Sequence, residues 1–223
     1  MDGLGIASAL VWHIAQLDYD AASGNELVAH SIGGSDRLSG CWAILPPQTA
    51  EVIRPDFFEQ MARSGIRALR AFPERHRFLL NRTAFGGFLD ELVERRIPLM
   101  LSEMAPSDAA VSWQAVYALL EQCPNLVCVL CDLGIWGADR YSWPLLERYE
   151  HVYLETSLLS MEAGGLEATV ARFGCERLLF GSGFPARYPE AAMLSLMHAD
   201  IGQADRETIA QTNLERVLSE VRL

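Results

Sequence analysis

The sequence predicts an α/β fold, a (β/α) barrel of the triosephosphate-isomerase type. Seven short segments are continuously apolar or rich in β-branched residues, and each ends in a polar, glycine or proline residue. Strands that are covered on both faces have this pattern. Stretches with helical spacing of apolar residues separate these segments. Such alternation is typical of a parallel sheet, which is either closed into a barrel or open and doubly wound.

The expected strands share an apolar interior and a polar or turn-forming end. They cover Ala7–His13, Leu38–Pro46, Ile66–Pro73, Pro98–Glu103, Leu126–Asp132, Val152–Ser157 and Arg177–Gly183. A closed barrel of this type has eight strands, one more than these seven. The chain opens with Met1–Ile6, which has the pattern of a helix end running into a strand. We therefore expect a single barrel domain over residues 1–223 that is truncated at its N-terminus and lacks the first strand.

Helices are expected wherever apolar residues recur every three or four positions. Three such stripes lie within residues 85–93, 113–123 and 166–173. Pro55 and Gly65 delimit a further helix, because proline favours a helix start and glycine a helix end. The last helix is expected over residues 206–221, with Asp205 as its N-cap.

Composition excludes several classes of protein. The net charge of -11 argues against binding to nucleic acid or to an anionic membrane surface. No stretch has the charge and length of a signal peptide or of a membrane span, so a cytoplasmic location is expected. Most of the five cysteines stand in apolar runs, which predicts buried thiols in a reducing compartment. Cys128 and Cys131 should face opposite sides of one strand, so they cannot bind a metal jointly.

No glycine-rich phosphate-binding motif follows any of the expected strands. The most informative motif is Leu-Leu-Phe-Gly-Ser-Gly-Phe-Pro at residues 178–185. It resembles the Phe-Gly-Ser-Asp-Phe-Pro signature that closes the last strand of the amidohydrolase-related metal-dependent hydrolases. The other strand segments follow in the order of that family over almost the whole chain. The Asn213-x-x-Arg216 pattern near the end is similar to its closing helix.

The resemblance implies a hydrolase or carboxy-lyase barrel, but the family's metal ligands do not carry over. Its fifth-strand histidine falls at Ser102, its sixth-strand histidine at Asp132 and its eighth-strand aspartate at Gly183. The family's His-x-His motif belongs to the first strand, which is absent from this sequence. A zinc site normally needs three protein ligands. No residue is therefore predicted to bind a metal, and zinc or manganese would need other ligands or a preceding strand.

Three carboxylates end successive expected strands: Glu103, Asp132 and Glu155. Side chains at the carboxyl ends of parallel strands converge at the mouth of a barrel. One interpretation is an acidic cluster that binds a hard cation or acts as acid and base, with Asp132 and Glu103 catalytic and Glu155 binding substrate. The other is that these groups are solvated or paired with Arg70 and Arg187.

His13 ends the first expected strand and is the best placed of the five histidines for catalysis, although histidine is often an ordinary hydrogen-bonded side chain. Arg70 would grip a substrate carboxylate. The alternative is an internal salt bridge from Arg70 to Glu103 or Asp132. Ser102, Ser182 and Arg187 complete the predicted substrate-binding set. Ser182 is not expected to be a nucleophile, because its Gly-Ser-Gly turn leads into a proline and not into a helix.

Two functional hypotheses remain beside a truncated gene, which would explain the missing first strand but not Ser102 or Gly183. The first is a divergent amidohydrolase-like enzyme that hydrolyses or decarboxylates a small carboxylate-bearing substrate. The second is a non-catalytic relative that binds a small ligand or a partner chain in the same pocket. A missing first strand would leave the neighbouring strands with unpaired edges, so association into a homodimer is expected.

Overall fold

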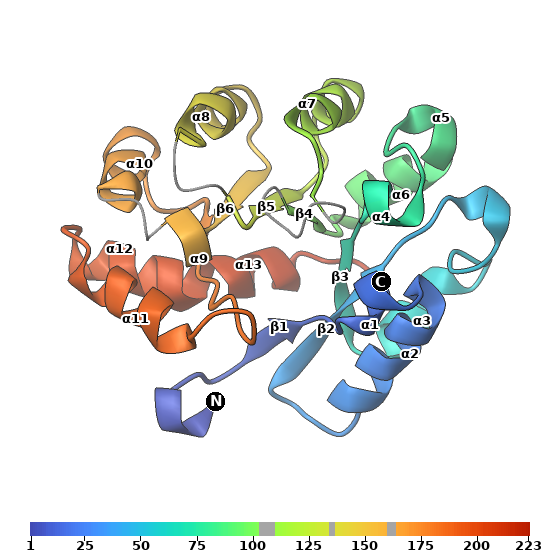
Figure 1. The fold of residues 1–223 in the computed structure, drawn as a ribbon, viewed down its shortest axis with the longest axis horizontal. Helices are drawn as coiled ribbons and strands as arrows, with labels where there is room; N and C mark the ends of the chain where they lie inside the picture. The colour runs from blue at the N-terminus through green and yellow to red at the C-terminus, as the bar shows by residue number, and fades with distance from the viewer. Residues whose placement is uncertain (103–109, 134–136, 160–163) are drawn as a thin grey trace.

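The structure is a computed structural model, and it describes residues 1–102, 110–133, 137–159 and 164–223. Seven parallel strands form one curled sheet in the order β1-β2-β3-β4-β5-β6-β7 (Figure 1). They are β1 (Ala9–Val11), β2 (Leu38–Ala43), β3 (Ile66–Arg70), β4 (Leu99–Ser102), β5 (Cys128–Cys131), β6 (Val152–Glu155) and β7 (Leu178–Leu179). This sequential order confirms the predicted barrel-type fold. The open alternative is wrong, because a doubly wound sheet reverses its strand order at a switch point.

The strands are shorter than the sequence predicts. The largest difference is at β7, which covers only Leu178–Leu179 of the expected Arg177–Gly183. After β6, Thr156–Leu159 forms the short helix α9 in place of the expected end of the strand. The β1 strand ends at Val11, so His13 lies beyond it. The expected spans also included Asp132, which follows β5. It lies at the carboxyl end of the strand without taking part in the ladder, which is where a barrel places its functional side chains.

Helices connect successive strands, and several begin with a side-chain cap. Asp20 accepts a hydrogen bond from the backbone N–H of Ser23, and Ser112 accepts one from that of Ala115. The remaining helices are η1 (Asp2–Leu4), α1 (Ala15–Asp18), α2 (Ala21–Ile32), η2 (Pro47–Thr49), α3 (Phe57–Arg63), α4 (Pro73–His76), α5 (Arg82–Phe85), α6 (Gly87–Arg95), α7 (Trp113–Gln122), α8 (Asp139–Arg148), α10 (Gly165–Phe173), α11 (Pro189–His198), α12 (Gln203–Glu207), the π-helical turn η3 (Thr208–Thr212) and α13 (Asn213–Ser219).

The expected last helix is three consecutive pieces, α12, η3 and α13. It starts at Gln203, three residues earlier than predicted, and Gly202 is its N-cap. Asp205 therefore lies in the first turn and is not the cap, which corrects the prediction. A carboxylate in the first turn still stabilises a helix, because it interacts favourably with the positive end of the helix dipole. Asp205 therefore does mark the start of the helix, although the start was predicted about one turn too late.

The sheet has an apolar layer on each face. Alternate strand residues, among them Leu101, Cys128 and Leu154, belong to the large cluster shared with the helices that follow the strands. The intervening residues, among them Cys131 and Tyr153, pack with Val217 of α13. Figure 1 shows α13 on the opposite side of the strands from α7 and α8. The prediction that Cys128 and Cys131 face opposite sides is confirmed, since the two residues belong to different clusters.

A cavity of about 410 Å³ lies between the two end strands of the sheet. Residues of β1 and of the segment after β7 line it together with α11, η3 and α13. Most of the lining is apolar, including Leu10, Phe180, Leu196 and Leu214. Ser182, one of the predicted substrate-binding residues, also lines this cavity.

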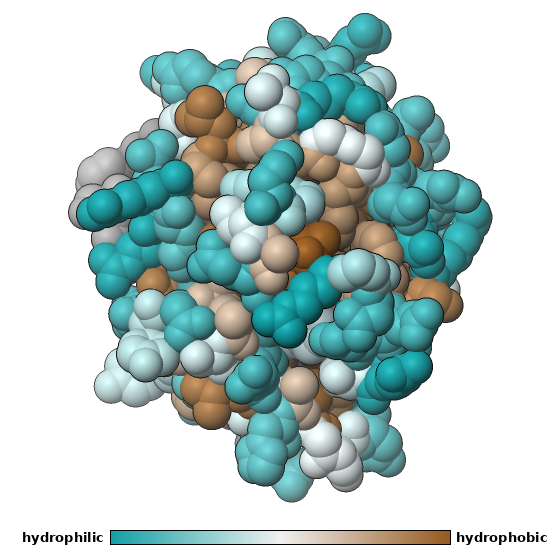
Figure 2. Space-filling view, turned by 90° about the vertical axis from the view of Figure 1, so that its right-hand side faces the viewer, coloured by the Kyte–Doolittle hydropathy of each residue, from teal (hydrophilic) through white to brown (hydrophobic). Residues whose placement is uncertain are grey.

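Hydrophilic side chains cover most of the face shown in Figure 2, the right-hand side of the view in Figure 1, and apolar residues show between them. Within the part of the chain that the structure describes, no helix has the length and apolar character needed to cross a membrane.

Candidate active site at the carboxyl ends of the strands

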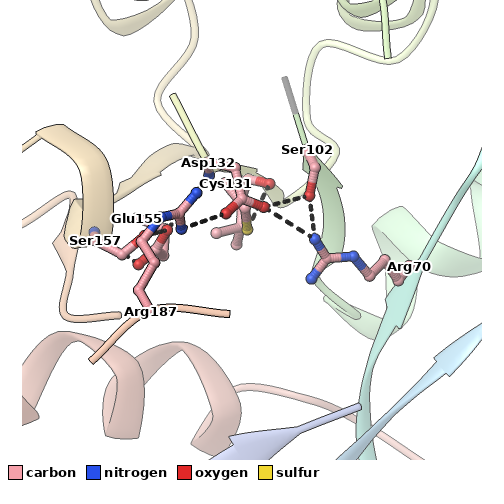
Figure 3. Close-up of polar contacts among 8 residues, drawn as sticks. Arg70, Ser102, Cys131, Asp132, Glu155, Ser157 and Arg187 are labelled. Atoms are coloured by element: carbon pink, nitrogen blue, oxygen red, sulfur yellow. Dashed lines mark hydrogen bonds and ion pairs between the residues drawn. The ribbon is translucent and has the colours of Figure 1, made fainter. Parts of the chain in front are cut away.

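Five of the predicted site residues meet at one edge of the sheet (Figure 3). Arg70, Ser102 and Glu155 end β3, β4 and β6, and Asp132 follows the last residue of β5. Arg187 comes from the segment between β7 and α11. Parallel strands bring all their carboxyl ends to the same edge, so residues far apart in sequence become neighbours there.

Asp132 is the centre of this cluster. Its Oδ2 accepts a hydrogen bond from Ser102 Oγ at 2.8 Å, and Arg70 Nη2 lies 3.4 Å from the same oxygen. Its Oδ1 accepts from Arg187 Nη1 at 3.1 Å. Asp132 has φ of 52°, in the left-handed region that few residues other than glycine adopt. Both carboxylate oxygens are thus occupied by donors, and two of these donors are cationic.

Arg70 is held rigidly. Its side chain is 7% exposed, and its guanidinium lies 4.6 Å from the ring centre of Trp12 and 5.5 Å from that of Phe72. It also donates to Ser102 Oγ, while its Nε is buried without a hydrogen-bond partner among the described residues. A buried cation requires a paired anion, and Asp132 provides it. The internal salt bridge to Asp132, one of the two interpretations of Arg70, is therefore present.

Glu155 accepts three hydrogen bonds. Its Oε1 accepts from the backbone N–H of Ser157 at 2.8 Å, and its Oε2 accepts from Ser157 Oγ at 2.8 Å and from the backbone N–H of Asp132 at 3.4 Å. Burial raises the pKa of Glu155, the bonds from Ser157 oppose that shift, and the negative charge of Asp132 raises the pKa further. Glu155 is thus a fixed carboxyl group that gains a proton more readily than an exposed glutamate.

Gly181 makes room for Glu155. A Cβ atom at Gly181 would lie 1.4 Å from Glu155 Oε1 and 2.2 Å from its Cδ, which no side chain can accommodate. The Gly181-Ser182-Gly183 turn was noted in the sequence as a strand end, but its role as a space for a neighbouring carboxylate depends on β6 and was not predicted. Ser157 was also missed as a Glu155 partner, and its position two residues after Glu155 is the only sequence signal for it.

The remaining predicted residues are not brought into this cluster by the described structure. His13 Nδ1 accepts from the backbone N–H of Ala15 at 3.1 Å, so its ring caps the start of α1. Ser182 Oγ accepts from the backbone N–H of Phe184 at 3.3 Å. Glu103 lies outside the described residues.

Comparison with known proteins supports the family resemblance. The model of the amidohydrolase family matches residues 2–219. No curated protein sequence matches the chain significantly. The fold resembles that of an uncharacterized TIM-barrel protein from Bordetella bronchiseptica, with 17% identity, a TM-score of 0.76 and coverage of 99% of this chain and 80% of that one.

Two decarboxylases have the same fold. One is 2,6-dihydroxybenzoate decarboxylase from Rhizobium, with 18% identity, a TM-score of 0.72 and coverage of 98% of this chain and 86% of that one. The other is 5-carboxyvanillate decarboxylase from Novosphingobium aromaticivorans, complexed with manganese and 4-hydroxy-3-methoxy-5-nitrobenzoic acid. It has 16% identity, a TM-score of 0.67 and coverage of 98% of this chain and 78% of that one.

The side chains at the Asp132 cluster do not fit a metal site of that kind. Among the residues that the structure describes, no three His, Cys, Asp or Glu side chains come together to hold an ion. Two carboxylates are present, Asp132 and Glu155, and the first already accepts from two guanidinium groups. A divalent ion at Asp132 would have to approach a carboxylate that three hydrogen-bond donors already contact, against the repulsion of both arginines.

Proposed function

Since the chain belongs to the amidohydrolase family, we propose that it is an enzyme that hydrolyses or decarboxylates a small carboxylate-bearing molecule at the Asp132 cluster. One observation carries this proposal: two guanidinium groups flank Asp132 at the carboxyl ends of the strands, next to the half-buried Glu155, whose pKa is raised. Cations that bind an anionic substrate and a carboxyl group that exchanges protons are the parts that either reaction needs.

Arg187 is the group that binds the substrate carboxylate. Its side chain is 29% exposed, and among the described residues it donates a hydrogen bond only to Asp132, through Nη1. A guanidinium carries five N–H donors, so Arg187 keeps donors for a bidentate contact with a second carboxylate. Arg70, held between Trp12 and Phe72, fixes Asp132 and thereby fixes the position of Arg187.

Glu155 is the proton-transfer group. In a decarboxylation, the C–C bond to the departing CO2 breaks, the electron pair stays on carbon, and protonated Glu155 gives that carbon a proton. In the hydrolysis of an ester or lactone, ionised Glu155 takes a proton from the water that attacks the carbonyl carbon. It returns that proton to the leaving oxygen as the C–O bond breaks. The raised pKa of Glu155 suits either role, because proton transfer is most efficient when the pKa approaches the working pH. Ser157 holds the carboxyl group in one orientation.

Aromatic hydroxy acids are the first substrates to test, because the two decarboxylases that share the fold are named for such acids. The experiment incubates the purified full chain with a panel of hydroxybenzoates and with simple esters and lactones, and it measures CO2 release or acid release. Activity should fall at least tenfold in Arg187→Gln and in Glu155→Gln.

A matched control is Arg63→Gln, which removes an arginine from an exposed ion pair with Glu59. This variant should keep full activity. Turnover that survives both site substitutions would place the chemistry elsewhere, and a panel without any turnover would leave the proposal without support.

The second candidate function is binding without catalysis, and the cavity of about 410 Å³ favours it. Small-molecule pockets have this size and a mainly apolar lining. A compound that raises the melting temperature of the wild type and of Arg187→Gln equally, and that is recovered unchanged, would support this alternative over the enzyme.

A further inference from the structure

We infer that the guanidinium groups of Arg187 and Arg70 supply at Asp132 the positive charge that a divalent cation would otherwise provide, and that this site binds a carboxylate without a metal. The inference deepens the proposed function and rests on it for the location of the ligand. It does not depend on turnover.

The hydrogen bonds of Asp132 are the first argument. Arg187 occupies Oδ1 at 3.1 Å, and Ser102 and Arg70 occupy Oδ2 at 2.8 Å and 3.4 Å. These three contacts take up most of the roughly four lone-pair sites through which a carboxylate would bind a metal. Two guanidinium charges face the carboxylate of Asp132 and the neighbouring carboxyl group of Glu155. The cluster is therefore neutral when Glu155 is ionised and net positive when Glu155 is protonated. In neither state does it carry the net negative charge that attracts a divalent cation, and the guanidinium groups attract an anion.

Gly183 is the second argument, because it gives Arg187 access to Asp132. A Cβ atom at position 183 would lie 3.0 Å from Arg187 Nη1, 3.2 Å from its Cδ and 3.3 Å from its Cβ. The arginine therefore packs over the bare Cα of Gly183, whose φ of 66° also suits glycine. A longer side chain at position 183, such as an aspartate, would occupy the space that the guanidinium uses.

The burial of Arg70 is the third argument. Its guanidinium is enclosed by Trp12, Phe72 and Ser102, and its Nε has no partner among the described residues. Arginine stays protonated in proteins, so this charge cannot be removed to admit an ion. A metal at Asp132 would lie against a permanent, immobile cation.

The first arm of the test measures metal binding by the full chain. Manganese(II) chloride is titrated into the metal-free protein, and the signal of free Mn²⁺ is followed by electron paramagnetic resonance. We expect the wild type to bind no more Mn²⁺ than Asp132→Asn does. Stoichiometric binding that is lost in Asp132→Asn overturns the inference. If that variant does not fold, Glu155→Gln, which removes the neighbouring carboxylate, replaces it.

The second arm uses benzoate as the carboxylate probe and isothermal titration calorimetry in the presence of EDTA. Benzoate should bind equally with and without the chelator, and about tenfold or more weakly in Arg187→Gln, while Arg63→Gln binds as the wild type does. Binding that requires added Mn²⁺, or no benzoate binding under either condition, overturns the inference. Metal-free binding without turnover of any panel substrate would overturn the proposed enzyme and leave this inference intact.

Discussion

Asp132 Oδ1 and Arg187 Nη1 lie 3.1 Å apart although 55 positions separate the two residues in the sequence. Arg70 reaches the same carboxylate from the other side (Figure 3). The three side chains come from the ends of two strands and from the segment after a third. The cluster therefore exists only when the sheet is assembled, and its disruption should affect both ligand binding and stability.

Asp132→Asn should destabilise the fold, because it leaves Arg70 buried without a counter-charge. Arg70 is almost fully buried and Asp132 is 23% exposed. Removal of one partner from a buried pair costs about 3 kcal/mol of unfolding free energy. Urea unfolding followed by circular dichroism measures the change. Glu59→Gln, in the exposed pair with Arg63, is the control and should have a much smaller effect. Equal losses in the two variants would show that Arg70 does not depend on Asp132.

Gly181→Ala should destabilise the protein by about 2 kcal/mol, because the new methyl group forces Glu155 out of its position. The clash involves Cγ, Cδ and Oε1 of Glu155, so the hydrogen bonds from Ser157 would break as well. Gly87→Ala is the matched control, since a Cβ atom there meets no atom within 4 Å. Unfolding curves of both variants give the comparison. A Gly181→Ala protein as stable as wild type would mean that Glu155 has another favourable conformation.

The stability of the protein should depend on the ionisation of Glu155. Its pKa is raised above the ordinary value of 4.5, so the folded state binds a proton that the unfolded state has already released. This contribution to stability is complete below that value and is lost as the pH rises through the folded-state pKa. The wild type should therefore lose stability relative to Glu155→Gln as the pH rises from 4.5.

Urea unfolding of the wild type and of Glu155→Gln across this pH range isolates the effect of Glu155. The other carboxylates with shifted pKa values, such as Asp20, are common to both proteins and cancel in the difference. A difference that stays constant with pH would contradict the raised pKa.

The native thiols should be almost unreactive. All five cysteines are free and buried, and burial raises the pKa values of Cys41 and Cys128 to about 12. Only the thiolate reacts rapidly with a disulfide reagent. Ellman's reagent should therefore label the native protein slowly and should label five thiols per chain in urea. Gln48→Cys, at an exposed position, provides the rate of an accessible thiol. Fast labelling of the wild type would contradict the predicted burial.

The sequence by itself determined the alternation of strands and helices, because strands buried on both faces are uniformly apolar and helices carry an apolar stripe. It also indicated that Arg70, Ser102, Asp132 and Glu155 would gather at one edge, since each lies at or near the end of an expected strand and parallel strands end together. The pairing of Asp132 with Arg70 and Arg187 was one of the interpretations that the sequence left open.

Only the tertiary structure decided that Asp132 pairs with both arginines, and it revealed what supports this pairing. The space that Gly181 leaves for Glu155 and that Gly183 leaves for Arg187 depends on neighbouring segments, and a local pattern contains no information about them. The same holds for the packing of α13 against Cys131 and Tyr153. Apolar spacing fixes which face of an element is buried, but the partner of that face is set by long-range packing, which arises only when the whole sheet forms.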